Sequence, residues 1–173
     1  MSGTTGRGMI VVGFDGSAHA KEAVRYAIDE AARSGQAVRA VVAHDSWALP
    51  FDVPLPENDR EIRQRVEDTA RRRVEAIRGE LDQAQRAVPV DVVAIIGPPV
   101  DVLVQEARDA TMLVVGHRGR GGLRSALLGS VGLSVVLHAP CPVTVVPPAP
   151  TARDAAPEDA ATLAGPLPLG PTA

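Results

Sequence analysis

Residues 112–130 read MLVVGHRGRGGLRSALLGS and combine three local patterns. An apolar run ends at Gly116, a loop rich in glycine and arginine follows, and an apolar helical pattern begins after Ser130. The run predicts a buried strand, and glycine lets the loop bend tightly. A helix N-terminus directed at such a loop presents unpaired N–H groups and the positive end of its dipole. The stretch therefore predicts an α/β fold with a phosphate-binding loop.

The polar side chains of the loop fit an anionic ligand. Arg118, Arg120 and Arg124 supply positive charge of the kind that grips phosphate, although each is equally well explained as a solvated loop residue. Ser130 is placed to cap the helix and to donate its hydroxyl to a phosphate oxygen. A P-loop is excluded because its Gly-Lys-Ser/Thr ending is absent, the only lysine of the chain being Lys21. The turn after the first strand also lacks the dinucleotide-binding glycine pattern.

Three motifs in order give the chain a family resemblance. Gly116-x2-Gly119-x9-Gly129-Ser130 is similar to the nucleotide-binding signature of the universal stress protein family, in its ATP-binding branch. The sequence IVVGFDGS at 10–17 resembles the first strand and Asp-x-Ser turn of that family, and APCPVTVV at 139–146 resembles its closing strand. The resemblance covers about residues 7–147, which we expect to form the nucleotide-binding domain.

The resemblance implies a ligand, an assembly and a set of contact residues. It implies ATP, with any Mg²⁺ carried by the phosphates, and a homodimer paired through the edge strand Val143–Val146. Asp15 would meet the ribose or adenine side, unless it only caps the following helix. The backbone of Ala43 would pair with the edge of adenine. The complete set of expected binding residues is Asp15, Ala43, Gly116, Arg118, Gly119, Gly129, Ser130 and Val131.

The amino-acid composition limits the classes of function that fit this chain. The chain has 173 residues, 45% of them apolar and 2% aromatic, and a formal net charge of −3. The acidic balance and the few aromatic residues argue against a nucleic-acid platform. A single cysteine excludes an internal disulfide, and no apolar run reaches membrane-spanning length or forms a signal peptide. We therefore expect a cytoplasmic protein without nucleic-acid or membrane partners.

Alternating apolar runs and helical patterns predict a five-stranded parallel sheet with helices on both faces. The resemblance implies a Rossmann-like fold with strand order 3-2-1-4-5. In that order Asp15 and Gly116 follow neighbouring strands at the switch point where ligands bind. Residues 148–173 are rich in Pro, Ala and Thr, which predicts a disordered tail. The predicted strands are 9–14, 37–43, 90–96, 112–116 and 143–146, and the predicted helices are 18–34, 58–87, 99–110 and 130–138.

Three classes of function remain open. The first is a regulatory stress-response protein whose ATP-bound state is read by partners; the second is a weak ATP hydrolase; the third is a nucleotide-free interaction module. No acid/base or nucleophile pair is evident, so no catalytic residue is assigned. The four histidines lack metal-ligand spacing, so no protein-bound metal is expected. AMP or cyclic AMP remains an alternative ligand. Gly132 stands where the family usually has Ser or Thr, which predicts a weaker hold on a third phosphate.

Overall fold

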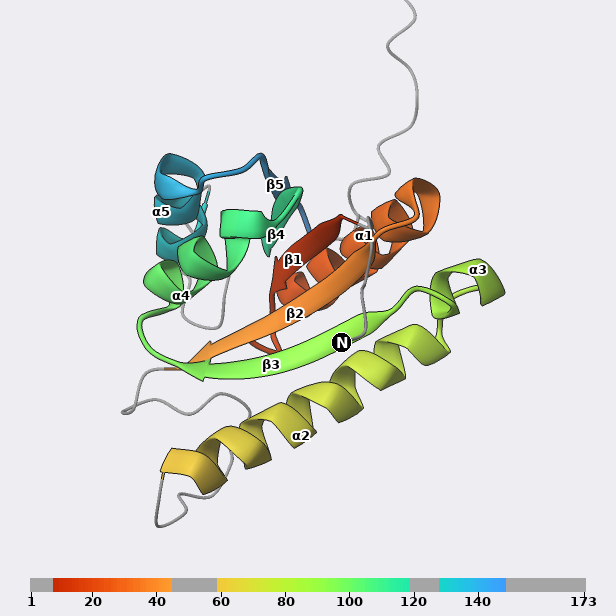
Figure 1. Ribbon diagram of the computed structural model, residues 1–173, viewed down its shortest axis with the longest axis horizontal. Coiled ribbons are helices and arrows are strands. Elements are labelled where there is room, and N and C mark those ends of the chain that lie inside the picture. Colours follow the sequence, from red (N-terminus) through yellow and green to blue (C-terminus); the bar gives the residue numbers. More distant parts are fainter. Residues whose placement is uncertain (1–7, 45–58, 119–127, 149–173) are drawn as a thin grey trace, which may run out of the picture.

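The computed structural model describes residues 8–44, 59–118 and 128–148, which form one α/β unit (Figure 1). Its five parallel strands have the order β3-β2-β1-β4-β5, which confirms the predicted fold class and topology. The strands are β1 (Met9–Gly13), β2 (Ala37–His44), β3 (Val90–Ile96), β4 (Met112–Gly116) and β5 (Val143–Val146). The helices are α1 (Ala18–Ser34), α2 (Asp59–Gly79), α3 (Gln83–Arg86), α4 (Pro99–Glu106) and α5 (Ser130–His138), with a 3₁₀ turn at Ala107–Asp109.

The sheet separates two apolar clusters. On one face, β1 directs Ile10 and Val12 toward α1 and α2. On the other face, Val11 packs with residues of α4 and α5. Successive side chains of a strand point to opposite faces, so a strand covered on both sides is apolar throughout. The continuous apolar runs of the sequence therefore become the central strands of a three-layer fold.

Helix α1 follows its sequence pattern closely. The Ser17 hydroxyl accepts the Ala20 N–H at 3.1 Å, so Ser17 caps the helix. Gly35 ends the helix with φ +68°, a conformation that glycine adopts without strain. The apolar residues that recur at i, i+3 and i+4 spacing in this helix are all buried: Ala20, Ala23, Val24, Ala27, Ile28 and Ala31. The helix thus starts directly after the turn that follows β1.

One long helix was predicted at 58–87, and this prediction is wrong. Helix α2 ends at Gly79, and the short helix α3 begins after Asp82. Asp82 and Gln85 form a reciprocal capping box that satisfies backbone groups and starts the new helix. The predicted helix 99–110 is also shorter, because its last turn tightens into 3₁₀ geometry after Glu106.

The remaining boundaries differ by a residue. Strand β2 continues to His44, one residue beyond the predicted end of that strand at 43. Residues 45–58 and the predicted tail beyond Pro148 lie outside the described residues. Within the described part of the chain, no helix combines the length and the apolar character needed to cross a bilayer.

Candidate functional site

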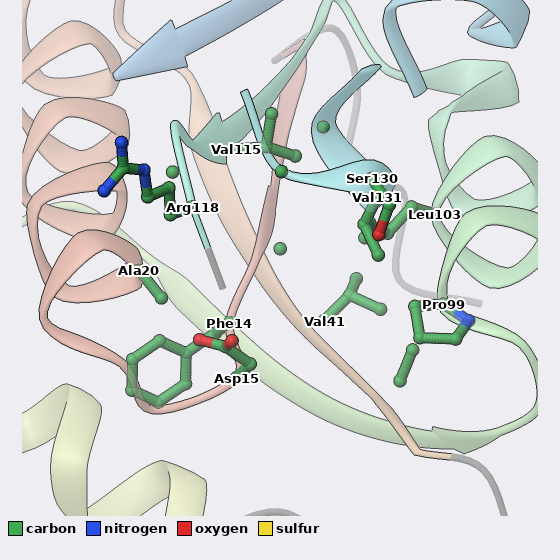
Figure 2. A pocket seen from close by; sticks show the side chains of 15 residues that line it. Phe14, Asp15, Ala20, Val41, Pro99, Leu103, Val115, Arg118, Ser130 and Val131 are labelled. Carbon is green, nitrogen blue, oxygen red and sulfur yellow. The ribbon is translucent and has the colours of Figure 1, made fainter. Parts of the chain in front are cut away.

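A cavity of about 290 Å³ lies where β1 and β4 end (Figure 2). This is the switch point of a doubly wound sheet, because β2 and β3 lie on one side of β1 and the later strands β4 and β5 lie on the other. Its volume is at the lower end of the range of small-molecule pockets. The lining residues are Gly13, Phe14, Asp15, Ala20, Val41, Ala43, Pro99, Leu103, Val115, Gly116, Arg118, Gly129, Ser130, Val131 and Gly132.

Seven of the eight predicted binding residues line this cavity. The eighth, Gly119, lies outside the described residues. Sequence reasoning missed the apolar part of the lining, chiefly Val41, Pro99 and Leu103. Val41 carried a usable signal, because it stands near the carboxyl end of a predicted strand. Pro99 and Leu103 reach the cavity because of how α4 packs, and no sequence motif predicts that packing.

The N-terminus of α5 forms the polar side of the cavity. Gly129 is the N-cap, and its carbonyl accepts the Leu133 N–H at 2.9 Å. The N–H groups of Ser130, Val131 and Gly132 precede this first intrahelical bond, so the helix provides no acceptor for them. All three residues line the cavity. The cavity therefore meets three backbone donors and the positive end of a helix dipole.

The predicted capping role of Ser130 is wrong. Gly129 occupies the N-cap position without a side-chain cap, and Ser130 is the first helical residue. A cap must lie outside the helical backbone conformation, and the Gly129-Ser130 step places the glycine there, with φ −66° and ψ 154°. The Ser130 hydroxyl is consequently not committed to closing its own helix.

Asp15 lies at the rim, on the turn between β1 and α1. Its Oδ1 accepts the Ser17 N–H at 2.9 Å, which closes the turn. Gly16 has φ +80°, and its carbonyl accepts Nη1 of Arg73 from α2 at 3.4 Å. Asp15 therefore closes the turn before α1 and does not cap the helix, since the cap is Ser17, and it also lines the cavity.

The backbone of Ala43 borders the cavity because β1 ends before it reaches this residue of β2. In parallel pairing, alternate residues direct both N–H and C=O to the same neighbour. Val41 faces β1, since its carbonyl accepts the Phe14 N–H at 2.9 Å, and His44 faces β3, since its carbonyl accepts the Gly97 N–H at 2.9 Å. Ala43 therefore faces the β1 side, but the β1 register ends at Val41. Within the described residues, β1 therefore offers no partner to the N–H and C=O of Ala43, which lie adjacent to the cavity.

Two backbone hydrogen bonds fix the position of His117, the residue that follows Gly116 at the end of β4. The His117 N–H donates to the Val146 carbonyl, and its own carbonyl accepts the Gly129 N–H, both at 2.9 Å. The imidazole lies against that of His19, with ring centroids 5.3 Å apart and planes at 53°. Burial lowers the pKa of His117, and the positive charges of Arg118 and His19 lower it further. Within the described segments, no three His, Cys, Asp or Glu side chains are grouped as metal ligands would be.

Comparison with known proteins decides the family. The sequence pattern described as the universal stress protein family matches residues 7–147. The chain belongs to this family. A universal stress protein of Thermus aquaticus is 34% identical over 140 residues, covering 79% of this chain and 96% of the relative. A universal stress protein of Mycobacterium tuberculosis is 32% identical over 168 residues, covering 90% of this chain. The chain spans only 52% of that longer relative.

One solved universal stress protein shares this fold and was crystallised with a nucleotide. A universal stress protein crystallised in complex with cAMP is 27% identical to this chain, with a TM-score of 0.58. The match covers 84% of this chain and 100% of the other. In the present universal stress protein, Gly132 is buried at the cavity, and a Cβ there would lie 3.1 Å from Cδ1 of Leu128. The departure from the family signature thus lies on the cavity wall.

Proposed function

We propose that this universal stress protein binds an adenine nucleotide, with ATP as the ligand, and that partners read its nucleotide-bound state. The observation that carries the proposal is one cavity lined by helix N-terminal amides and by the ends of β2 and α4. Phosphate needs the first surface, and a flat base needs the second.

The phosphates would lie against α5. Three N–H groups, from Ser130 to Gly132, and the helix dipole favour an anion there. Arg118 lines the same cavity, and the motif assigns Gly116, Gly119 and Gly129 to the phosphate loop. The exposed Ser130 hydroxyl supplies a further donor. Mg²⁺ would arrive with the triphosphate, held by phosphate oxygens and water.

The base would lie against β2 and α4. Val41, Pro99 and Leu103 give this end of the cavity an apolar surface, and the small Ala43 side chain leaves room for a ring. Adenine presents an amino donor beside a ring acceptor, which matches the C=O and N–H of Ala43. Guanine presents the opposite order on its Watson–Crick edge. The order of donor and acceptor on the Ala43 backbone therefore favours ATP over GTP.

The comparison with the cAMP complex supports the adenine class of ligand. A homodimer through β5 is part of the proposal, since β5 is an edge strand. A cytosolic setting agrees with the single cysteine of the chain, because disulfides are rare there.

The test is calorimetric titration of the full chain with ATP, GTP, AMP and cAMP. We expect ATP to bind at least about tenfold more tightly than GTP, the usual scale for one paired base edge. Ala43→Pro removes the N–H that faces the base and should erase the preference, whereas Ala43→Ser keeps the N–H and should retain it. Equal affinity for ATP and GTP would refute the base assignment. Tighter binding of AMP or cAMP than of ATP would reassign the ligand.

A further inference from the structure

Two helices begin at the cavity. Pro99 is the first residue of α4 and Ser130 is the first residue of α5, and both line the cavity (Figure 2). A helix N-terminus carries the positive end of the helix dipole and amides without an intrahelical acceptor. By these properties alone a polyphosphate could lie against either helix, so the residues at the two ends decide between them.

Helix α4 begins with two residues that cannot donate a backbone hydrogen bond. Pro98 is its N-cap and Pro99 its first residue, and proline has no N–H. The first intrahelical bond runs from the Val102 N–H to the Pro98 carbonyl at 3.1 Å. The amides of Val100 and Asp101 precede it, but neither residue is among the described residues that line the cavity. Asp101 also places a carboxylate in the first turn. At the cavity, α4 therefore presents a pyrrolidine ring in place of a donor.

Helix α5 begins in the opposite way. Its N-cap, Gly129, has no side chain, and its first turn, which the structure describes in full, contains no acidic residue. The amides of Ser130, Val131 and Gly132 precede its first intrahelical bond, and all three residues line the cavity. Of these two helix ends, α5 therefore supplies the donors that an anion needs.

The neighbours of Pro99 complete an apolar surface. Leu103 lies one turn further along α4, Val41 comes from β2, and both line the cavity. Leu103 is only 4% exposed, so the packing of α4 fixes its position. An uncharged ring can pack on such a surface, whereas a phosphate there would lose its water without gaining a hydrogen bond.

We propose that Pro99 is a specificity-determining residue, which removes anion binding from the N-terminus of α4 and leaves that end to an uncharged ring. The inference rests on the proposed function and names its ligand class: a nucleoside polyphosphate with one anionic end, held with its phosphates at α5 and its base at α4. Asp101 adds to the effect, because its charge repels an anion from the same helix end. A bare polyphosphate gains nothing from α4.

The test compares ATP with inorganic tripolyphosphate, which has the phosphates and no base. Both are titrated calorimetrically into the full chain in magnesium-free buffer. Pro99→Ala restores the missing N–H with a residue that suits a helix. We expect it to raise the affinity for tripolyphosphate about three- to tenfold, the net worth of one typical hydrogen bond. ATP should gain no affinity, because its base occupies this end of the cavity and loses the proline ring.

Two further variants control for the substitution itself. Pro98→Ala restores an N–H at an exposed residue that is not among the described residues lining the cavity, so the affinity for tripolyphosphate should stay as in the wild type. Asp101→Asn keeps both prolines and removes an exposed charge. It should raise the affinity for tripolyphosphate about twofold, since an exposed charge is largely screened.

The outcomes separate the two proposals. If Pro99→Ala leaves the affinity for tripolyphosphate unchanged, or Pro98→Ala raises it equally, the role of Pro99 is overturned, while bound ATP leaves nucleotide binding standing. If Pro99→Ala does not fold, Asp101→Asn decides, and an unchanged affinity for tripolyphosphate there would overturn the proposal. Absence of ATP binding by the folded wild type would refute both proposals.

Discussion

Gly116 at the end of β4 and His19 in the first turn of α1 are in close backbone contact. A Cβ at Gly116 would lie 2.8 Å from both the carbonyl carbon and the carbonyl oxygen of His19. Real side chains do not approach backbone so closely, and neither backbone is free to yield. The glycine that opens the phosphate motif thus also lets α1 pack beside the cavity.

Replacing Gly116 by alanine should therefore destabilise the fold. We expect Gly116→Ala to lower the free energy of unfolding by about 1–3 kcal/mol, the usual cost of overpacking. Gly79→Ala is the matched control, since a Cβ at Gly79 would meet no atom within 4 Å, and it should be neutral or mildly stabilising. Urea unfolding measures both. Equal stability of the two variants would show that α1 moves without cost.

The fold was largely predictable because its signals are local. A few neighbouring residues are enough to indicate an element: an apolar run does so for β1 and for β4, and the Ser17 cap does so for the start of α1. The strand order came from family resemblance, since periodicity does not specify which parallel strands are neighbours. The break after Gly79 was missed because the apolar face continues through Leu81, which is buried although it lies between two helices.

The polar side of the site was predictable, whereas its apolar lining was predicted only at Ala43, by family resemblance. Glycines and a serine at a helix start follow motif spacing, whereas Pro99 and Leu103 reach the cavity by the packing of α4. Packing depends on residues distant in sequence, so no short pattern reports it. The His19–His117 contact was likewise invisible, because the two residues are joined only by the folded sheet.

Restoring the family hydroxyl should strengthen binding of the triphosphate. Gly132→Ser adds a side chain whose Cβ meets Leu128 Cδ1 at 3.1 Å, the end of a flexible side chain that can shift. We expect ATP affinity to rise about three- to tenfold, the net worth of one typical hydrogen bond. Gly132→Ala should not reproduce this gain. Calorimetry in which Ser and Ala behave alike would remove Gly132 from the phosphate contacts.

Protein stability should depend on pH through His117. Its pKa is lowered in the folded state, so the unfolded chain is protonated first as the pH falls below about 6.5. The stability contribution is therefore present above that pH and is lost progressively below it. Urea unfolding at about pH 7.5 and 5.5 should show a larger loss for wild type than for His117→Asn. Equal losses would mean that His117 titrates normally.

The geometry of β5 identifies the residues through which it would pair with a second copy of the chain. The carbonyl of Pro142 accepts the N–H of Leu113 in β4, and that of Val146 accepts the N–H of His117 directly after β4. By alternation, Val143 and Val145 direct their N–H and C=O outward. Val145→Pro removes one outward N–H without removing a β4 bond, and should convert a dimer to monomer. Val145→Thr keeps the N–H and should remain dimeric. Light scattering that finds a monomeric wild type, or a dimeric Val145→Pro, would refute pairing through β5.

The central claim is that the N-terminus of α5 binds the phosphates of an adenine nucleotide. Gly129 has backbone angles open to any residue, and Asp and Asn are both favourable N-caps. Gly129→Asp places a carboxylate on the amides proposed for phosphate, while Gly129→Asn has nearly the same shape without the charge. The decisive measurement is calorimetric titration of ATP into both folded variants. The account predicts that Gly129→Asp loses binding by at least about a hundredfold relative to Gly129→Asn, on the scale of a close charge–charge repulsion. Equal ATP affinity in the two variants would contradict it.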